Sequence, residues 1–319
     1  MQKIVLTSFG RNLGHKAPSF KNLTLHIDGG VAVVALSRIE KKNAFSWEMY
    51  EDLTYLINTA AKEDGIKVLL LSGSGNFYSS GNDITNFRGY NISKTSFLFC
   101  RMAQKFVDSF IKFPKPLVVA INGPAIGIAV TTLALCDKVY CVPNAYFHTP
   151  FVEVGVTPEG CSTFTFPKIM GEKLANEVLW KGKRLSSSDA LAIGLVHEVV
   201  KSESLLPVAL AYCKQLAALP LHSEELRKTL PRNNETLQKL QDVNKEEWEI
   251  LQNKLVSYQT LGFLSNYFFL RKLYLNAIYM RYDHFLRREN NQYERTFPRS
   301  IFLNIRFAQI YVGVLGKRT

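Results

Sequence analysis

Two continuous runs of apolar residues constrain the fold of this 319-residue chain more than any other feature. They are Val68 to Leu71 and Leu117 to Ile121, and neither run alternates with polar residues. Such runs are typical of parallel strands covered on both faces, because each face then needs apolar side chains. Loops of glycine and small residues follow them, over 77–84 and 122–129. The sequence therefore predicts a buried parallel sheet, with loops at the carboxyl ends of its strands that could bind a ligand.

The segments around these runs alternate between strand and helix. Residues 23–27 and 31–36 flank Asp28-Gly29-Gly30, which predicts a hairpin. Ser46 predicts the N-cap of a helix, because apolar residues then recur at helical spacing. The remaining predictions are helices over 96–113, from 125 onward and through most of the chain after 168 (including 186–200), and a strand over 139–142. This order of elements predicts an α/β fold.

Charge is distributed unevenly and divides the chain. The net charge is +12, and residues 255–319 hold ten Lys and Arg against three acidic residues. We expect three parts: residues 1–20, a flexible or targeting N-terminus; residues 21–254, the folded domain; and residues 255–319, a basic, aromatic tail. The tail is expected to be helical and to pack on the core or on a neighbouring subunit, or else to be a dispensable extension. The positive charge suits an anionic partner: a nucleic acid, a membrane surface or a phosphorylated ligand.

Other classes of protein are less consistent with the sequence. Five cysteines without a CxxC pair indicate reduced thiols in an intracellular protein. No apolar run approaches the roughly 20 residues of a membrane-spanning helix, so we expect no membrane span. No zinc-ligand pattern or RNA-binding motif is present in the sequence, and we expect no bound metal and no nucleic acid.

The two loops have a possible catalytic role. Glycines at the carboxyl end of a strand let backbone N–H groups converge on a ligand. Two such loops facing each other could donate two N–H groups to one oxygen, which is an oxyanion hole. On spacing alone, ordinary tight packing of loops in an α/β protein explains the same residues.

Taken together, the motifs resemble the crotonase (enoyl-CoA hydratase/isomerase) superfamily of acyl-CoA enzymes. The resemblance rests on Leu36 to Ala44, on SSGNDI and on INGPAIGIA, in that order along the chain. YSSGNDITNF and VTPEGCSTFTFPKIMG are similar to the peroxisomal-type enoyl-CoA delta isomerase branch, and the match runs from about Leu23 to Gln252. It implies an α/β crotonase-like spiral of ββα units with C-terminal helices, an acyl-CoA domain over 21–254, and a homotrimer.

The resemblance also implies roles for single residues. Asn82 and Ile128 occupy the positions of the two oxyanion-hole N–H groups. The residues expected to bind the CoA part of the substrate are Ser80, Gly81, Asn82, Asp83, Ile84 and Gly127, with Arg38, Lys41 and Lys42 near its phosphates. For the three basic residues, a solvated basic turn is an equal alternative.

The position of the carboxylates distinguishes the reactions of the family. Its hydratases activate water with two glutamates, and here those positions are Thr131 and Phe151. Glu159 occupies the position of the single catalytic acid of the isomerase branch, in apolar surroundings that would strengthen it as a base. Glu153 is the rival base, and His148 is expected to be structural. The resemblance therefore implies an isomerase that moves the double bond of 3-enoyl-CoA to the 2-trans position during fatty acid oxidation, with no cofactor beyond the CoA of its substrate.

Two alternatives and a location complete the expectations. The chain could be a catalytically weak crotonase-like acyl-CoA-binding or chromatin-associated module, or a 2-enoyl-CoA hydratase. We expect it in the peroxisome or the mitochondrial matrix, although its last residues, Gly316 to Thr319, are not an S-K-L type signal.

Overall fold

The computed structural model describes residues 20–87, 92–219 and 233–255. Two sheets organise these residues. The larger has the order β1-β2-β3-β4-β6-β9 and the smaller the order β5-β7-β8. Their strands are β1 (Leu23–Asp28), β2 (Val31–Leu36), β3 (Val68–Gly73), β4 (Leu117–Ile121), β5 (Ala125–Ile126), β6 (Lys138–Cys141), β7 (Tyr146–His148), β8 (Leu185–Ser186) and β9 (Glu198–Val199).

The predicted hairpin and the predicted parallel sheet are both confirmed. β1 pairs antiparallel with β2 through a turn in which Gly29 and Gly30 have φ of 58° and 82°, values that favour glycine. From β2 to β9 every pair in the large sheet is parallel. All five residues of β4 are buried, as its continuous apolar run predicts.

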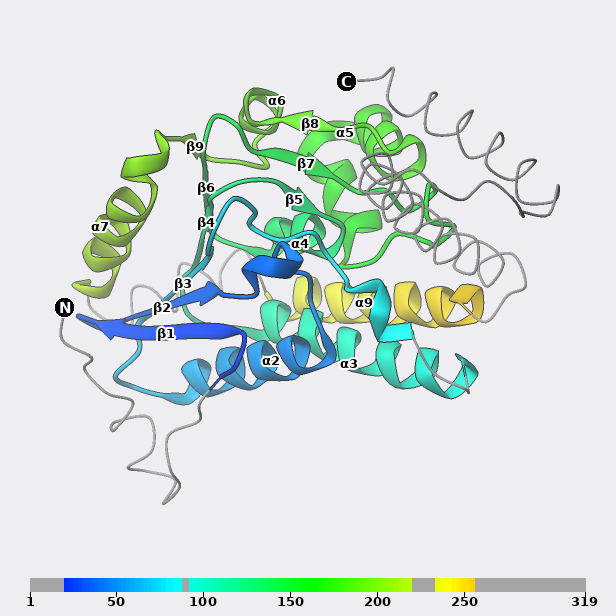
Figure 1. Ribbon diagram of the computed structural model, residues 1–319, viewed down its shortest axis with the longest axis horizontal. Helices are drawn as coiled ribbons and strands as arrows, with labels where there is room; N and C mark the ends of the chain where they lie inside the picture. Colours follow the sequence, from blue (N-terminus) through cyan, green and yellow to red (C-terminus); the bar gives the residue numbers. More distant parts are fainter. Residues whose placement is uncertain (1–19, 88–91, 220–232, 256–319) are drawn as a thin grey trace, which may run out of the picture. The chain divides into compact units, whose positions relative to one another are not determined.

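Helices cover this sheet in two groups (Figure 1). α7 (Leu205–Ala217) packs against β2, β3, β4 and β6. α2 (Trp47–Lys62), α3 (Ile92–Lys112) and α9 (Asn234–Leu255) pack on one another, with α3 between the other two. The remaining helices are α4 (Ile128–Thr131), α5 (Ser162–Lys181), α6 (Ser187–Ala192) and the short 3-10 helices η1 (Ile39–Lys41), η2 (Ile84–Phe87), η3 (Thr132–Leu135) and η4 (Ser202–Ser204).

Several sequence-based boundaries need correction. The Ser46 hydroxyl accepts the Met49 N–H, so its predicted N-cap role is confirmed. The helix predicted from 125 begins instead with strand β5, because Ala125 and Ile126 pair with β7. The helix predicted over 186–200 ends at Ala192, since Gly194 has φ of 82° and β9 follows.

Three further predictions bear on the whole chain. None of the five cysteines, which all lie in the described ranges, forms a disulfide. In the same ranges, no helix combines the length and the apolar character needed to cross a membrane. The predictions for residues 1–19 and for residues 256–319 of the tail fall outside the described residues.

Candidate active site

The two glycine-rich loops lie side by side, as the sequence predicts. The Ser79 N–H donates to the Pro124 carbonyl (3.3 Å), and the Ile126 N–H donates to the Ser79 carbonyl (3.0 Å). Gly81 has φ of 80°, and a Cβ placed on it would lie 2.6 Å from the Ile126 carbonyl oxygen. Only glycine allows the loops to approach this closely.

The N–H groups of Asn82 and Ile128 are left without an acceptor among the described residues. Asn82 forms a parallel bridge with Phe45, in which the Phe45 N–H donates to Gly81 and the Phe45 carbonyl accepts from Asp83. The Asn82 N–H therefore points away from Phe45. Ile128 is the first residue of α4, whose first N–H groups have no partner within the helix. These two groups are the donors that the sequence predicts for an oxyanion hole, and that role remains a prediction.

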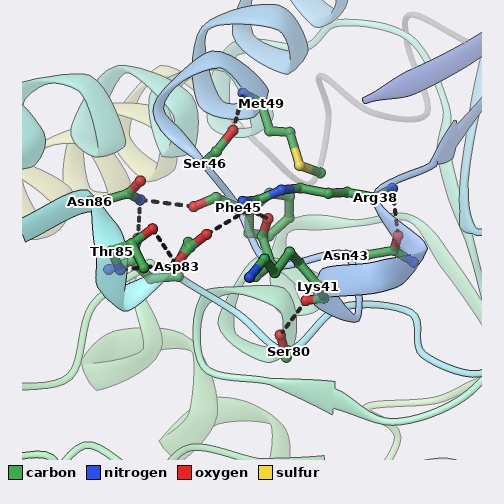
Figure 2. Close-up of polar contacts among 12 residues, drawn as sticks. Arg38, Lys41, Asn43, Phe45, Ser46, Met49, Ser80, Asp83, Thr85 and Asn86 are labelled. Atoms are coloured by element: carbon green, nitrogen blue, oxygen red, sulfur yellow. Dashed lines mark hydrogen bonds and ion pairs between the residues drawn. The ribbon is translucent and has the colours of Figure 1, made fainter. Parts of the chain in front are cut away.

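An ion pair between Arg38 and Asp83 holds the first loop (Figure 2). Arg38 Nη1 donates to Asp83 Oδ2 (2.6 Å) and to the Ala44 carbonyl (3.0 Å). Asp83 Oδ1 accepts from the backbone N–H and the hydroxyl of Thr85. Burial acts in the opposite direction, but the hydrogen bonds from Thr85 and the Arg38 guanidinium hold the pKa of Asp83 below its ordinary value.

Of the three residues predicted to bind phosphate, one is held inside the fold and two are exposed. The Arg38 side chain is only 16% exposed and is committed to Asp83, so it supports the loop from within. Lys41 and Lys42 are exposed. The Ser80 hydroxyl donates to the Lys41 carbonyl (3.3 Å), and the Ser80 N–H donates to the Lys42 carbonyl (2.9 Å), so the basic turn adjoins the first loop (Figure 2).

The other predicted binding residues lie on the same two loops. Ile84 begins η2 directly after Asp83 and is half-buried. Gly127 precedes α4 with φ of 59° and donates its N–H to the His148 carbonyl (2.8 Å). The CoA-binding role of each of these residues remains a prediction.

Glu159 contacts Thr131 of α4 and is 4% exposed. Its Oε1 accepts from the Thr131 hydroxyl (3.2 Å), whereas its Oε2 has no partner among the described residues. Burial, and then the nearby charge of Glu247, raise the pKa of Glu159 well above its ordinary value, which the Thr131 hydrogen bond partly opposes. Because Thr131 belongs to the helix that begins at Ile128, one short element both contacts the carboxylate and carries one predicted oxyanion-hole donor.

The residues around Glu159 show which other groups could take part. Phe151, at the second hydratase position, is buried and apolar. The rival base Glu153 is 57% exposed and contacts His148 Nε2 (3.2 Å), so its carboxylate already has a partner. Burial, with the nearby charge of Arg184, lowers the pKa of His148, although Glu153 opposes the shift.

Sequence reasoning missed Glu247, a buried residue of α9. Its carboxylate accepts hydrogen bonds from Cys161 and Thr163, which lie two and four residues after Glu159 in the chain. The signal was present in the sequence: Asn244 and Glu247 interrupt the buried apolar stripe of α9, formed by Leu240, Val243, Trp248, Leu251 and Leu255. Polar residues within such a stripe need a partner.

The two loops, whose Asn82 and Ile128 N–H groups have no acceptor among the described residues, and the buried carboxylate of Glu159 make up the candidate active site. The family model "Enoyl-CoA hydratase/isomerase" matches residues 26–259. The chain belongs to this enoyl-CoA hydratase/isomerase family.

Among the known proteins that this chain resembles are two enoyl-CoA delta isomerases. The chain is 38% identical to enoyl-CoA delta isomerase 2 of Rattus norvegicus over 254 residues, which are 79% of this chain and 64% of that protein. It thus spans less than two thirds of that relative's length. It is 36% identical to peroxisomal enoyl-CoA delta isomerase 3 of Mus musculus, over 81% of this chain and 82% of that protein.

A solved structure supports the fold. The enoyl-CoA hydratase/isomerase of Pseudoalteromonas atlantica T6c superposes with a TM-score of 0.71 at 30% identity, covering 78% of this chain and 97% of that one. The predicted crotonase-like fold is therefore confirmed.

Proposed function

We propose that this chain is an enoyl-CoA delta isomerase that converts 3-enoyl-CoA to 2-trans-enoyl-CoA. The observation that carries the proposal is the buried carboxylate of Glu159, which has one oxygen free, with Thr131 and Phe151 at the positions where hydratases hold glutamates. Glu247 is also near, but three hydrogen bonds to backbone and hydroxyl donors occupy its oxygens. It is therefore not a partner for activating water.

One base is sufficient for this reaction. The C2 hydrogen of a 3-enoyl thioester is both allylic and α to the carbonyl, so its removal gives a dienolate with charge on the thioester oxygen. The N–H groups of Asn82 and Ile128 would stabilise that oxygen, and one such donor typically contributes about 10²–10³ in rate. Glu159 takes the proton from C2 and returns it at C4. The chemistry needs no metal, redox cofactor or water.

The environment of Glu159 suits this role. Its raised pKa makes the ionised carboxylate a stronger base than an exposed glutamate. The same shift requires the pH to be high enough to ionise it, so the proposal includes a loss of turnover at acidic pH.

Partners and location follow as parts of the proposal. The substrate is an acyl-CoA, whose phosphates would meet Lys41 and Lys42. We propose a homotrimer, by analogy with the family. We also propose a peroxisomal or mitochondrial location, and the peroxisomal mouse relative favours the first.

The decisive test is a pair of assays on the purified protein and on Glu159→Gln. We expect absorbance of the conjugated product from 3-enoyl-CoA, and a loss of about 10²–10⁴-fold in Glu159→Gln with acyl-CoA binding retained, because the amide keeps the shape but cannot accept a proton. Glu153→Gln is the matched control and should retain turnover. Full turnover in Glu159→Gln would place the base elsewhere.

The same protein samples test the alternatives. Hydration of 2-enoyl-CoA at a rate comparable to isomerisation would favour the hydratase. Tight acyl-CoA binding with no turnover of either substrate would favour the binding module.

A further inference from the structure

Helix α5 begins three residues after Glu159, at Ser162, and the side chain of its N-cap residue, Cys161, makes no capping hydrogen bond. Helices usually satisfy their first N–H groups with a nearby Ser, Thr, Asp or Asn. Here Glu247 supplies the acceptor from α9, 86 residues further along the chain.

The contact is extensive for a single side chain. Glu247 Oε2 accepts the Cys161 N–H (2.7 Å), and Oε1 accepts both the N–H (3.0 Å) and the hydroxyl (2.6 Å) of Thr163. A carboxylate at a helix N-terminus also interacts favourably with the helix dipole. Glu247 is 5% exposed, so little solvent screens these interactions.

The backbone from Glu159 to Cys161, the residue whose N–H Glu247 accepts, has little conformational freedom. Gly160 and Cys161 both have left-handed φ, 71° and 62°, and the second is unusual for a residue with a side chain. A Cβ on Gly160 would lie 2.3 Å from Thr131 Oγ1. The Glu159 carbonyl accepts from the Ser162 hydroxyl (2.7 Å). Fixing Cys161 therefore fixes the position from which the Glu159 side chain extends.

Glu247 is itself held in place. Three residues earlier in α9, Asn244 Nδ2 donates to the Gln104 carbonyl (3.1 Å) and to Asp108 Oδ1 (2.9 Å) on α3. The Cys161 thiol donates to the Leu240 carbonyl of α9 (3.3 Å). The segment after Glu159 is thus tied to α9, which is itself tied to α3.

We propose that Glu247 is a positioning residue for Glu159: it caps α5 from α9 and thereby sets both the place and the electrostatic surroundings of the base. This inference rests on the proposed function, because it takes Glu159 as the base.

The charge of Glu247 has its own consequence. The groups that face Glu159 are Thr131 from α4, Tyr50 from α2, Cys161 at the start of α5 and Glu247 from α9. Burial raises the pKa of Tyr50 and of Cys161, so both stay neutral near pH 7. Burial also raises the pKa of Glu247, although its hydrogen bonds from Thr163 and Cys161 oppose that shift. When Glu247 is ionised, its negative charge disfavours ionisation of Glu159, after burial itself.

Two substitutions weigh charge against position. Glu247→Gln keeps the length of the side chain and removes the charge, so the acid limb of the pH profile of kcat/KM should move to lower pH. The amide has one acceptor oxygen in place of two, so a hydrogen bond to Cys161 or Thr163 is also lost and kcat should fall as well. Glu247→Asp keeps the charge and shortens the reach, so kcat should fall about tenfold to hundredfold while the acid limb stays near that of the wild type. Glu249→Gln, at an exposed position of α9, is the control and should change neither.

A second readout does not depend on turnover. Glu159 can be titrated by carboxyl ¹³C NMR of glutamate-labelled protein, with its signal assigned by its loss in Glu159→Gln. A wild type without isomerase activity refutes the proposed function, whereas an unmoved Glu159 titration in Glu247→Gln overturns this inference.

Thermal unfolding shows whether the variants fold. If neither Glu247 variant folds, Thr163→Val removes only the hydroxyl donor to Glu247 and should lower kcat with KM unchanged. Wild-type kcat in Thr163→Val would then overturn the inference, as would an acid limb that Glu247→Gln leaves in place.

Discussion

Arg38 and Asp83 form a 2.6 Å ion pair at the residue that directly follows Asn82 in the first loop. The side chains are 16% and 9% exposed, so the pair is largely shielded from water. Residue 82 directly precedes Asp83, and its side-chain oxygen accepts from Asn86 (2.8 Å). The ion pair therefore orients a backbone donor rather than a ligand.

Asp83→Asn should destabilise the fold by about 1–3 kcal/mol at neutral pH, because Arg38 loses its charged partner in a buried setting. The pKa of Asp83 is lowered in the folded state, so its contribution is present above the pKa of an unfolded aspartate and is lost as the pH falls through the folded value. Denaturant unfolding across acidic pH measures both effects. Glu40→Gln is the control, since Glu40 is 70% exposed at 4.0 Å from the same arginine and should cost at most about 1 kcal/mol. Equal losses in the two variants would contradict the role given to Asp83.

Gly81→Ala should lower isomerase turnover by about 10²–10³-fold, the cost of one oxyanion-hole donor. The added Cβ meets the Ile126 carbonyl oxygen and forces the two loops apart. Gly29→Ala is the matched control: its φ is also positive, at 58°, but nothing lies within 4 Å of its Cβ. If Gly81→Ala loses no more turnover than Gly29→Ala, the close approach of the loops is not needed for catalysis.

Thr131→Val should move the acid limb of kcat/KM to higher pH. The Thr131 hydroxyl lowers the pKa of Glu159, so its removal raises that pKa and the base stays protonated over a wider acidic range. Thr132→Val is the control, because that hydroxyl donates to the Ile128 carbonyl (2.7 Å) and does not contact Glu159. A shift in the opposite direction would show that the hydroxyl does not stabilise the ionised carboxylate.

Replacing Lys41 and Lys42 together by Gln should raise KM for acyl-CoA and weaken its dependence on salt, with kcat unchanged. Both lysines are exposed, and the Lys41 carbonyl accepts from the Ser80 hydroxyl, so their side chains can reach phosphates bound at the first loop. Steady-state kinetics at two ionic strengths measure the effect. Lys173→Gln, an exposed lysine on α5, serves for comparison. An unchanged KM would favour a solvated basic turn.

Local signals explain what the sequence predicts well. The hairpin, the Ser46 cap and the buried β4 each depend on a few adjacent residues. The strands β5, β7 and β8 have two or three residues each, too few for a period to appear, and they form only because Ala125 and Leu185 both come next to β7.

The residues of the candidate site also fall into those that a local motif predicts and those that it does not. Motifs on the two loops identify Asn82 and Ile128 as candidates, and the separate motif VTPEGCSTFTFPKIMG identifies Glu159. The partner of Arg38 and the cap supplied by Glu247 join residues 45 and 86 positions apart, and no local pattern encodes such pairs. For Glu247, only an acid within an apolar helical stripe indicates that a buried partner exists.

The hydrogen bond between Glu247 and Cys161 also affects the order of folding. It closes a loop of 86 residues, and closing long loops costs entropy that is recovered only when distant contacts form. The strands of the large sheet can pair before α9 reaches its place. During synthesis, the segment that carries Glu159 leaves the ribosome well before the residue that fixes it. We therefore expect catalytic competence to come only once α9 has packed, because Glu247 caps the segment after Glu159 only from that point.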